Sequence, residues 1–320
     1  MNPADVCGMA DVPLLESAHT SSFTLVERLN LAVLAILVFV FGGAGGGTAA
    51  NAGLTMWLAG LLVLTVMAPR ALKDQPSADV VRLWLPLVVL VSVYESIGPV
   101  IAIAGAPPRD GWVILLERLT TGGVLPPLRP MAIAPIIVDL LSLAYAAYFI
   151  LPIALLAALV RRHETVGAHH ALLTLLVAFY LHYLIYLIVP VVGPLRASEL
   201  PESLRIQLVS GGGWVTTHLR LLIRCLEGTP QDAFPSAHTS VTLLVAALAR
   251  KHRLPLRWWV LAAALPIVAS TVLLGYHYIV DVLAAVPVTW LAWRIGQTLS
   301  ADDAARSPVS PFRAGSRISG

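Results

Sequence analysis

Residues 170–192 read HALLTLLVAFYLHYLIYLIVPVV and contain no Asp, Glu, Lys or Arg. A helix of about 20 apolar residues crosses the hydrocarbon core of a bilayer, so this stretch predicts a membrane-spanning helix. The whole chain has the same character, because 58% of its 320 residues are hydrophobic and only 12% are charged. A soluble domain carries about 25% charged residues. The composition therefore excludes a soluble monomer and a disordered chain, and two Cys exclude a disulfide scaffold.

Seven further apolar blocks accompany this stretch. Leu, Val, Ala and Ile dominate them without the strict alternation of a barrel strand, so each is expected to be helical. The fold class predicted is an all-α polytopic membrane bundle of about eight transmembrane helices. The predicted spans are 24–42, 52–68, 80–105, 133–160, 170–192, 236–250, 257–275 and 278–298. Residues 1–79 then form an N-terminal membrane hairpin, 80–298 the main transmembrane domain and 299–320 a disordered polar tail.

The basic residues predict the orientation of these spans. Most Lys and Arg fall in one set of connections, including Arg161, Arg162 and the cluster at 250–257. The positive-inside rule places this set, and both termini, in the cytoplasm. The net charge of +3 is modest and is not a nucleic-acid footprint. Arg greatly outnumbers Lys, which hints at a GC-rich bacterial genome, and we expect a multi-pass protein of the bacterial inner membrane.

Two long segments on the opposite side interrupt the pattern. Residues 106–132 include an apolar face with Asp110 and Glu117 beside it, and residues 193–234 include WVTTHLRLLIRCLEG. Each is interpreted as containing a short helix in the membrane interface. The alternative is that both are simple connectors.

Ionisable side chains inside apolar spans are costly, so each is a functional candidate. Glu95 and Asp139 are expected to pair or to hydrogen-bond within the bundle, and His182 is expected to be a core residue whose hydrogen bonds are satisfied.

Two segments indicate a catalytic site. In the first, residues 231–240 (QDAFPSAHTS), Pro235 suits the first turn of a helix and Ser236 offers a hydroxyl and a free N–H. Helix N-termini of this kind bind phosphate, and His238 is the titratable group beside it.

The second segment, residues 270–281, reads STVLLGYHYIVD. His277 and Asp281 are four apart, so a helix places them on one face. The carboxylate can hold one ring nitrogen and leave the other as nucleophile or base. The predicted topology brings His238, His277 and Asp281 to the same membrane face, which indicates one catalytic site within residues 80–298.

These two segments resemble the second and third signature motifs of the type 2 phosphatidic acid phosphatase superfamily. That superfamily also includes lipid phosphotransferases such as inositol phosphorylceramide synthase and sphingomyelin synthase. The resemblance implies a six-helix catalytic core over about 110–298. Two departures matter: the Arg usual after Ser270 is Thr271, and no Lys-x6-Arg-Pro motif occurs. VPVVGPLR at 189–196 and LLERLTTGGVLP at 115–126 are more similar to the inositol phosphorylceramide synthase branch.

The resemblance implies a phospho-histidine mechanism on a lipid-linked phosphate ester. His277, oriented by Asp281, attacks phosphorus, while His238 protonates the leaving alkoxide and then deprotonates the acceptor. Ser236, Arg196 and Ser270 would bind the phosphate, and Arg220 and Arg224 would be headgroup contacts. No cofactor and no metal are expected. The partner expected is a membrane lipid, not a nucleic acid, and the oligomeric state stays open.

Two other functions remain open on the sequence. The first is a lipid phosphate phosphatase acting on phosphatidate or a polyprenyl pyrophosphate, because the same chemistry serves water as acceptor. The second is a non-enzymatic lipid transporter, which would be expected to show inverted repeats that are not evident here. A scaffold that has lost activity is disfavoured by the joint presence of His238, His277 and Asp281.

Overall fold

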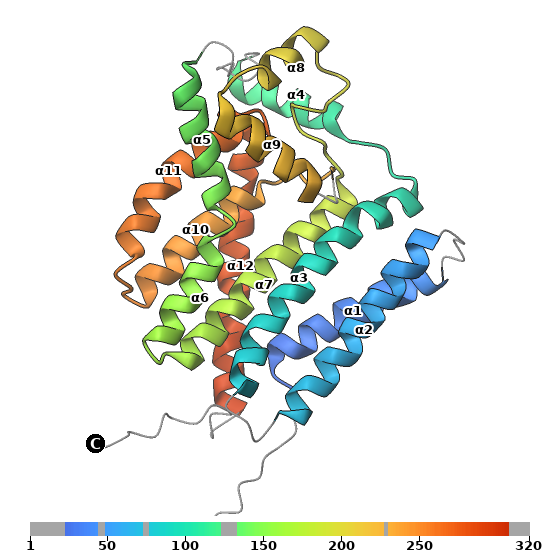
Figure 1. The fold of residues 1–320 in the computed structure, drawn as a ribbon, viewed down its shortest axis with the longest axis vertical. Helices are drawn as coiled ribbons and strands as arrows, with labels where there is room; N and C mark the ends of the chain where they lie inside the picture. Colours follow the sequence, from blue (N-terminus) through green and yellow to red (C-terminus); the bar gives the residue numbers. More distant parts are fainter. Residues whose placement is uncertain (1–22, 44–48, 73–76, 123–132, 227–229, 307–320) are drawn as a thin grey trace, which may run out of the picture.

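The computed structural model describes residues 23–43, 49–72, 77–122, 133–226 and 230–306. These residues form twelve α-helices and no strand longer than an isolated bridge between Val191 and Asp232 (Figure 1). The all-α bundle predicted from the sequence is confirmed. The helices are α1 Leu25–Gly43, α2 Ala49–Ala71, α3 Ser77–Ala104, α4 Asp110–Thr121, α5 Pro135–Ala147, α6 Leu151–Arg161, α7 Thr165–Ile188, α8 Glu202–Val209, α9 Trp214–Leu226, α10 Ala237–Lys251, α11 Arg257–Leu273 and α12 Ile279–Arg306.

The central helix of the bundle is α7, which contains most of the apolar stretch 170–192. Its apolar residues lie on all sides, and a helix of that kind is buried in a bundle. It packs against α1, α3, α6, α10 and α12. The stretch that predicts the membrane class is therefore also the core of the fold.

All eight predicted spans are helical, but they differ in length. Within the described part of the chain, five helices are long and apolar enough to cross a bilayer alone, namely α1, α2, α3, α7 and α12. The predicted span 133–160 consists of two helices, α5 and α6, bent by 52° and counted as a sixth span if taken together. Helix α10 has 15 residues and α11 has 17. At 1.5 Å per residue α10 is about 22 Å long, which is shorter than the bilayer core of about 30 Å. Of the predicted eight, α10 and α11 are therefore shorter than a helix that crosses the bilayer core alone.

The bend between α5 and α6 has an identifiable cause. Pro152 has no N–H to donate to the carbonyl of Tyr148, so the helical ladder is interrupted there. The chain continues through tight turns in which Leu151 N–H donates to Tyr148 O at 3.2 Å. The break places the aromatic residues Tyr145, Tyr148 and Phe149 at mid-bundle rather than along a straight helix.

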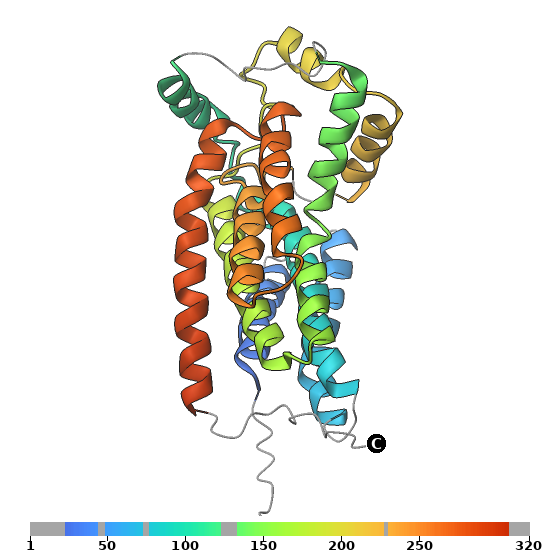
Figure 2. The same ribbon diagram turned by 90° about the vertical axis from the view of Figure 1, so that its left-hand side faces the viewer.

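Three short helices, α4, α8 and α9, lie together at one end of the bundle (Figures 1 and 2). Helix α12 runs from that end to the opposite end, where α1 begins. Both predicted interfacial helices are present as α4 and α9, and α8 is an additional helix. Residues 123–132 and 227–229 of the two segments lie outside the described residues.

The predicted division into an N-terminal hairpin, a transmembrane domain and a tail stays a prediction, but α12 runs past the predicted start of the tail at residue 299. Helices α1 and α2 pack on each other and against α3, as a hairpin does. Helix α12 continues to Arg306. The extension contains Ala301, Ala304 and Ala305, which favour helix, and the first proline after it is Pro308. Residues 307–320 lie outside the described part of the chain.

A close approach between α7 and α12 provides a test of the packing. A Cβ built on Gly296 would lie 2.5 Å from the Thr174 Oγ1 atom, whereas one built on Gly60 in α2 would meet nothing within 4 Å. We expect Gly296→Ala to push α12 from α7 and lower the free energy of unfolding by about 1–3 kcal/mol. Thermal unfolding of the detergent-solubilised protein would measure this. Gly60→Ala is the control and should leave the melting temperature unchanged or higher; equal melting temperatures for the two variants would contradict the packing.

Candidate active site

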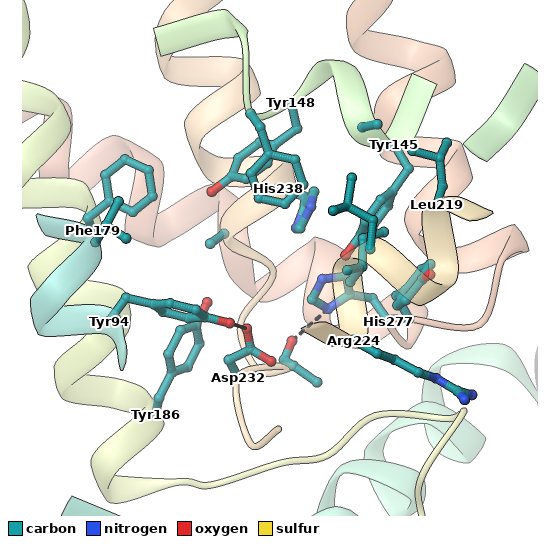
Figure 3. Close-up of a pocket in the computed structure, with 18 of the residues that line it drawn as sticks. Tyr94, Tyr145, Tyr148, Phe179, Tyr186, Leu219, Arg224, Asp232, His238 and His277 are labelled. Carbon is teal, nitrogen blue, oxygen red and sulfur yellow. Dashed lines mark hydrogen bonds between the residues drawn. The ribbon is translucent and has the colours of Figure 1, made fainter. Parts of the chain in front are cut away.

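The imidazole of His277 is held through one of its two nitrogens. His277 lies in the turn before α12 and is buried. Its Nδ1 lies 2.7 Å from the carbonyl oxygen of Ala233 and 3.4 Å from Asp281 Oδ2. Because a carbonyl only accepts, Nδ1 carries the proton and Nε2 is the basic nitrogen. This hydrogen bond occupies Nδ1 and leaves the lone pair of Nε2 outside it (Figure 3).

Asp281 is fully buried in the first turn of α12. Its Oδ2 accepts a hydrogen bond from Tyr278 N–H at 2.7 Å, so the carboxylate is fixed beside the ring of His277. The structure thus brings the two residues together as their spacing predicted. The carbonyl of Ala233 is an additional partner that no side-chain pattern reveals.

The two sequence motifs are joined through Ser236. Ser236 caps α10, where its hydroxyl accepts from Thr239 N–H at 3.3 Å. Its own N–H donates to the main-chain carbonyl of Asp281 at 3.1 Å. The sequence interpretation of a free Ser236 N–H is therefore wrong, because α12 uses it. Binding of phosphate by the Ser236 hydroxyl stays a prediction.

The ring of His238 lies between the rings of Tyr145 and Tyr148 (Figure 3). The ring centroids are 4.2 Å and 3.9 Å from that of His238, and Phe149 adds an edge contact at 5.7 Å. The His238 and His277 centroids are 5.8 Å apart. His238 Nε2 is buried and has no hydrogen-bond partner among the described residues. The two histidines therefore face a common space with one nitrogen each to offer to a ligand.

That space is one end of a cavity of about 370 Å³. The polar end is lined by His238, His277, Asp232 and the arginines Arg196, Arg220 and Arg224. The apolar end extends between α3, α6 and α7 and is lined by Leu87, Leu90, Val91, Phe149, Pro152, Ile153 and Phe179. Within the described ranges, no group of three His, Cys, Asp or Glu side chains is arranged to hold a metal ion. The wall of the cavity is therefore amphipathic, because charged and apolar side chains line different parts of it.

The loop that carries Arg196 is pressed against the turn before His277. Gly193 has a φ of 78°, and a Cβ there would lie 2.5 Å from the carbonyl oxygen of Tyr276. Leu195 N–H donates to Gly275 O at 3.1 Å, which adds a second link. Glycine is required at 193 both by the backbone conformation and by the contact. Arg196 is thereby fixed at the wall of the cavity.

The two arginines of α9 are placed differently. Arg220 donates to the carbonyls of Leu208 and Gly211, each at 3.1 Å, and to that of Val209. Burial lowers the pKa of its guanidinium. Arg224 lies at the edge of the cavity with its guanidinium pointing away from His277 (Figure 3). Arg220 thus holds the loop before α9, and headgroup contact by either arginine stays a prediction.

The remaining candidates lie farther from the cavity. Ser270 is buried, does not line the cavity, and donates its hydroxyl to Ile267 O at 2.6 Å. Glu95 is half-buried on α3 and does not line the cavity either. His182 is buried in α7, where its Nδ1 lies 2.8 Å from Ala178 O.

Asp139, the other acidic residue inside a predicted span, holds the start of α9. Its Oδ1 accepts from Gly213 N–H at 2.8 Å, from Thr216 N–H at 2.9 Å and from the Thr216 hydroxyl. Asp139 therefore hydrogen-bonds within the protein, as expected, and it does so by capping the N-terminus of α9. It thereby fixes α9 and its arginines over the cavity.

Sequence reasoning missed three acidic residues around the site. Asp232 lines the cavity and accepts from the Tyr94 hydroxyl at 2.7 Å. Asp110 and Glu117 of α4 are fully buried, although the pattern placed them beside an interfacial face. Asp232 could have been found, because it is an ionisable residue four positions before Ser236. The other two are seven residues apart, a spacing that places them on one helix face but does not reveal that this face is buried.

The comparisons with known proteins agree with this geometry. The family model of the PAP2 superfamily matches residues 111–295, more than half of the chain. The chain therefore belongs to the PAP2 superfamily, and it is an integral-membrane enzyme of the phosphatase or phosphotransferase kind. Neither the search of curated proteins nor the search of solved structures gave a match.

His277 Nδ1 contacts both the Ala233 carbonyl and the Asp281 carboxylate. Loss of the carboxylate alone should therefore reduce activity without abolishing it. In Asp281→Asn the Ala233 carbonyl still holds the Nδ1 proton, so the ring keeps its tautomer but loses the compensating charge. We expect turnover of a lipid phosphate to fall by about 100-fold, at the lower end of effects on acid–base groups. His277→Ala should abolish turnover. Steady-state rates in detergent compare the two, and equal residual activities would contradict a separate role for Ala233.

Proposed function

We propose that the protein is a lipid phosphotransferase of the inositol phosphorylceramide synthase kind, which transfers a phosphoryl-bearing group through a phospho-histidine. The observation that carries the proposal is the fixed tautomer of His277, whose ring lies 5.8 Å from that of His238 in the lining of one cavity. A nucleophile, a proton donor and cationic side chains on one wall are the parts that phosphoryl transfer needs.

In the first step, His277 Nε2 donates its lone pair to phosphorus, and the bond from phosphorus to the leaving oxygen breaks. Protonated His238 gives its proton to that oxygen, so the leaving group departs as an alcohol. The imidazole of His277 then carries positive charge, which the Asp281 carboxylate at 3.4 Å compensates. In this step Arg196, which lines the cavity, balances the charge of the transferring oxygens.

In the second step, neutral His238 takes the proton of an acceptor hydroxyl as its oxygen bonds to phosphorus. The phosphorus–nitrogen bond breaks, and its electron pair returns to His277 Nε2. His238 is left protonated and ready for the next cycle. With water as acceptor, the same steps describe a lipid phosphate phosphatase.

The proposed place of the protein is the bacterial inner membrane, with both termini in the cytoplasm and the cavity open to the extracytoplasmic side. It is supported by the positions of the helix ends, since α1 begins and α12 ends opposite α4, α8 and α9 (Figures 1 and 2). The Lys and Arg cluster between α10 and α11 lies in a connection remote from the cavity.

Trapping the covalent intermediate tests the proposal. A headgroup-labelled phospholipid and a lipid monophosphate labelled at phosphorus are each mixed with enzyme and quenched in alkali, which preserves phospho-histidine. We expect label on the wild-type peptide containing His277 and none on His277→Ala. His238→Ala should form the intermediate slowly and retain it, because no base activates the acceptor.

The acceptor is identified by the product. Transfer of label to an added lipid alcohol would support the phosphotransferase, whereas release of inorganic phosphate alone would support the phosphatase. Uptake of lipid by proteoliposomes without any covalent label would instead support a transporter. A labelled His277→Ala protein would exclude the phospho-histidine mechanism.

A further inference from the structure

Helix α4 joins the two parts of the site from outside the cavity. Asp110 and Glu117 are seven residues apart, hence on one face of this helix, and both are fully buried. Neither lines the cavity. On the opposite face Trp112, Leu115 and Leu119 are exposed. The helix therefore turns its two carboxylates toward the catalytic elements and its apolar side chains outward.

Glu117 closes the N-terminus of α12. Its Oε1 accepts from Ile279 N–H at 3.1 Å and its Oε2 from Val280 N–H at 2.9 Å. The preceding N–H, of Tyr278, is taken by Asp281. Three successive N–H groups at the start of α12 are thus bound by two carboxylates, one of which belongs to the catalytic pair. Helix N-termini favour negative charge, so the cap is stable although buried.

Asp110 binds main-chain N–H groups of the loop that carries Arg196. Its two carboxylate oxygens accept from Val192 N–H at 2.9 Å and Gly193 N–H at 3.0 Å. Arg109 N–H also donates to Pro190 O at 2.7 Å. Burial raises the pKa of Asp110, and these N–H groups oppose that shift. One rigid helix therefore fixes both the nucleophile and the wall of the cavity.

We propose that Glu117 is a positioning residue for His277, acting through the first turn of α12. The turn fixed by Glu117 sets the direction of Asp281 and the place of His277, two residues before the helix begins. Through Asp110, α4 also sets the separation between His277 and the Arg196 loop. The inference rests on the proposed function, because it assigns Glu117 to the phosphoryl-transfer step.

The test compares Glu117→Ala and Glu117→Gln with Glu202→Ala, an exposed acidic residue of α8 at the same end of the bundle. In Glu117→Ala both N–H groups lose their acceptor, and we expect kcat to fall by about 100-fold, as for a misplacement of about 1 Å. KM should stay within about threefold, because Glu117 does not touch the cavity. Glu117→Gln keeps one accepting oxygen and should recover part of kcat. Glu202→Ala should match the wild type.

Two further measurements separate positioning from loss of fold. Single-turnover labelling of His277 should slow in parallel with kcat in both Glu117 variants. Hydrogen exchange of the peptide containing Tyr278–Asp281 should quicken, while exchange in α7 stays unchanged. A folded Glu117→Ala enzyme with wild-type kcat would overturn the inference, as would a rate loss explained by the unfolded fraction alone. An inactive wild-type enzyme would instead overturn the proposed function, and this inference with it.

Discussion

The site depends on two reciprocal hydrogen bonds to main-chain carbonyls, which join the segment before α10 to the start of α12. Ser236 N–H donates to the carbonyl of Asp281, and His277 Nδ1 donates to the carbonyl of Ala233. Each motif thus supplies a backbone group that holds the other. The relative place of His238 and His277 is therefore fixed by hydrogen bonds as well as by side-chain packing.

A second constraint comes from the environment. Little water is available inside a membrane bundle, and unsatisfied N–H groups at helix ends are costly there. The protein meets this cost with carboxylates from other helices: Glu117 at α12, Asp139 at α9 and Asp110 at the loop after α7. Since each carboxylate comes from a different segment than the N–H groups it binds, each cap is also a tertiary link. Three acidic residues of a chain poor in charge are used to assemble one end of the bundle.

Much of the fold and the centre of the site were predictable from the sequence. The length of the apolar runs predicted the all-α membrane bundle. The spacing of His277 and Asp281, together with the PSAH segment, identified residues that the structure brings together. The failures have a common physical origin. All of them involve main-chain groups, which are the same in almost every residue and so leave no pattern in a sequence. They are the Ala233 carbonyl, the use of Ser236 N–H and the caps by Asp110 and Glu117. The division of span 133–160 was missed because Pro152 lies inside an apolar run whose hydropathy does not change at the break.

That division bears on the choice between water and an alcohol as acceptor. The break between α5 and α6 delivers Tyr145 and Tyr148 to the two sides of His238, so the ring offers its edge to the cavity (Figure 3). An acceptor carried on a lipid would place its chain among the apolar residues of α3, α6 and α7 that line the cavity. In the proposed mechanism a chain bound in the apolar end therefore brings its hydroxyl to the base and excludes water at once. In that mechanism the same residues act in both reactions, and occupancy of the apolar end decides between them.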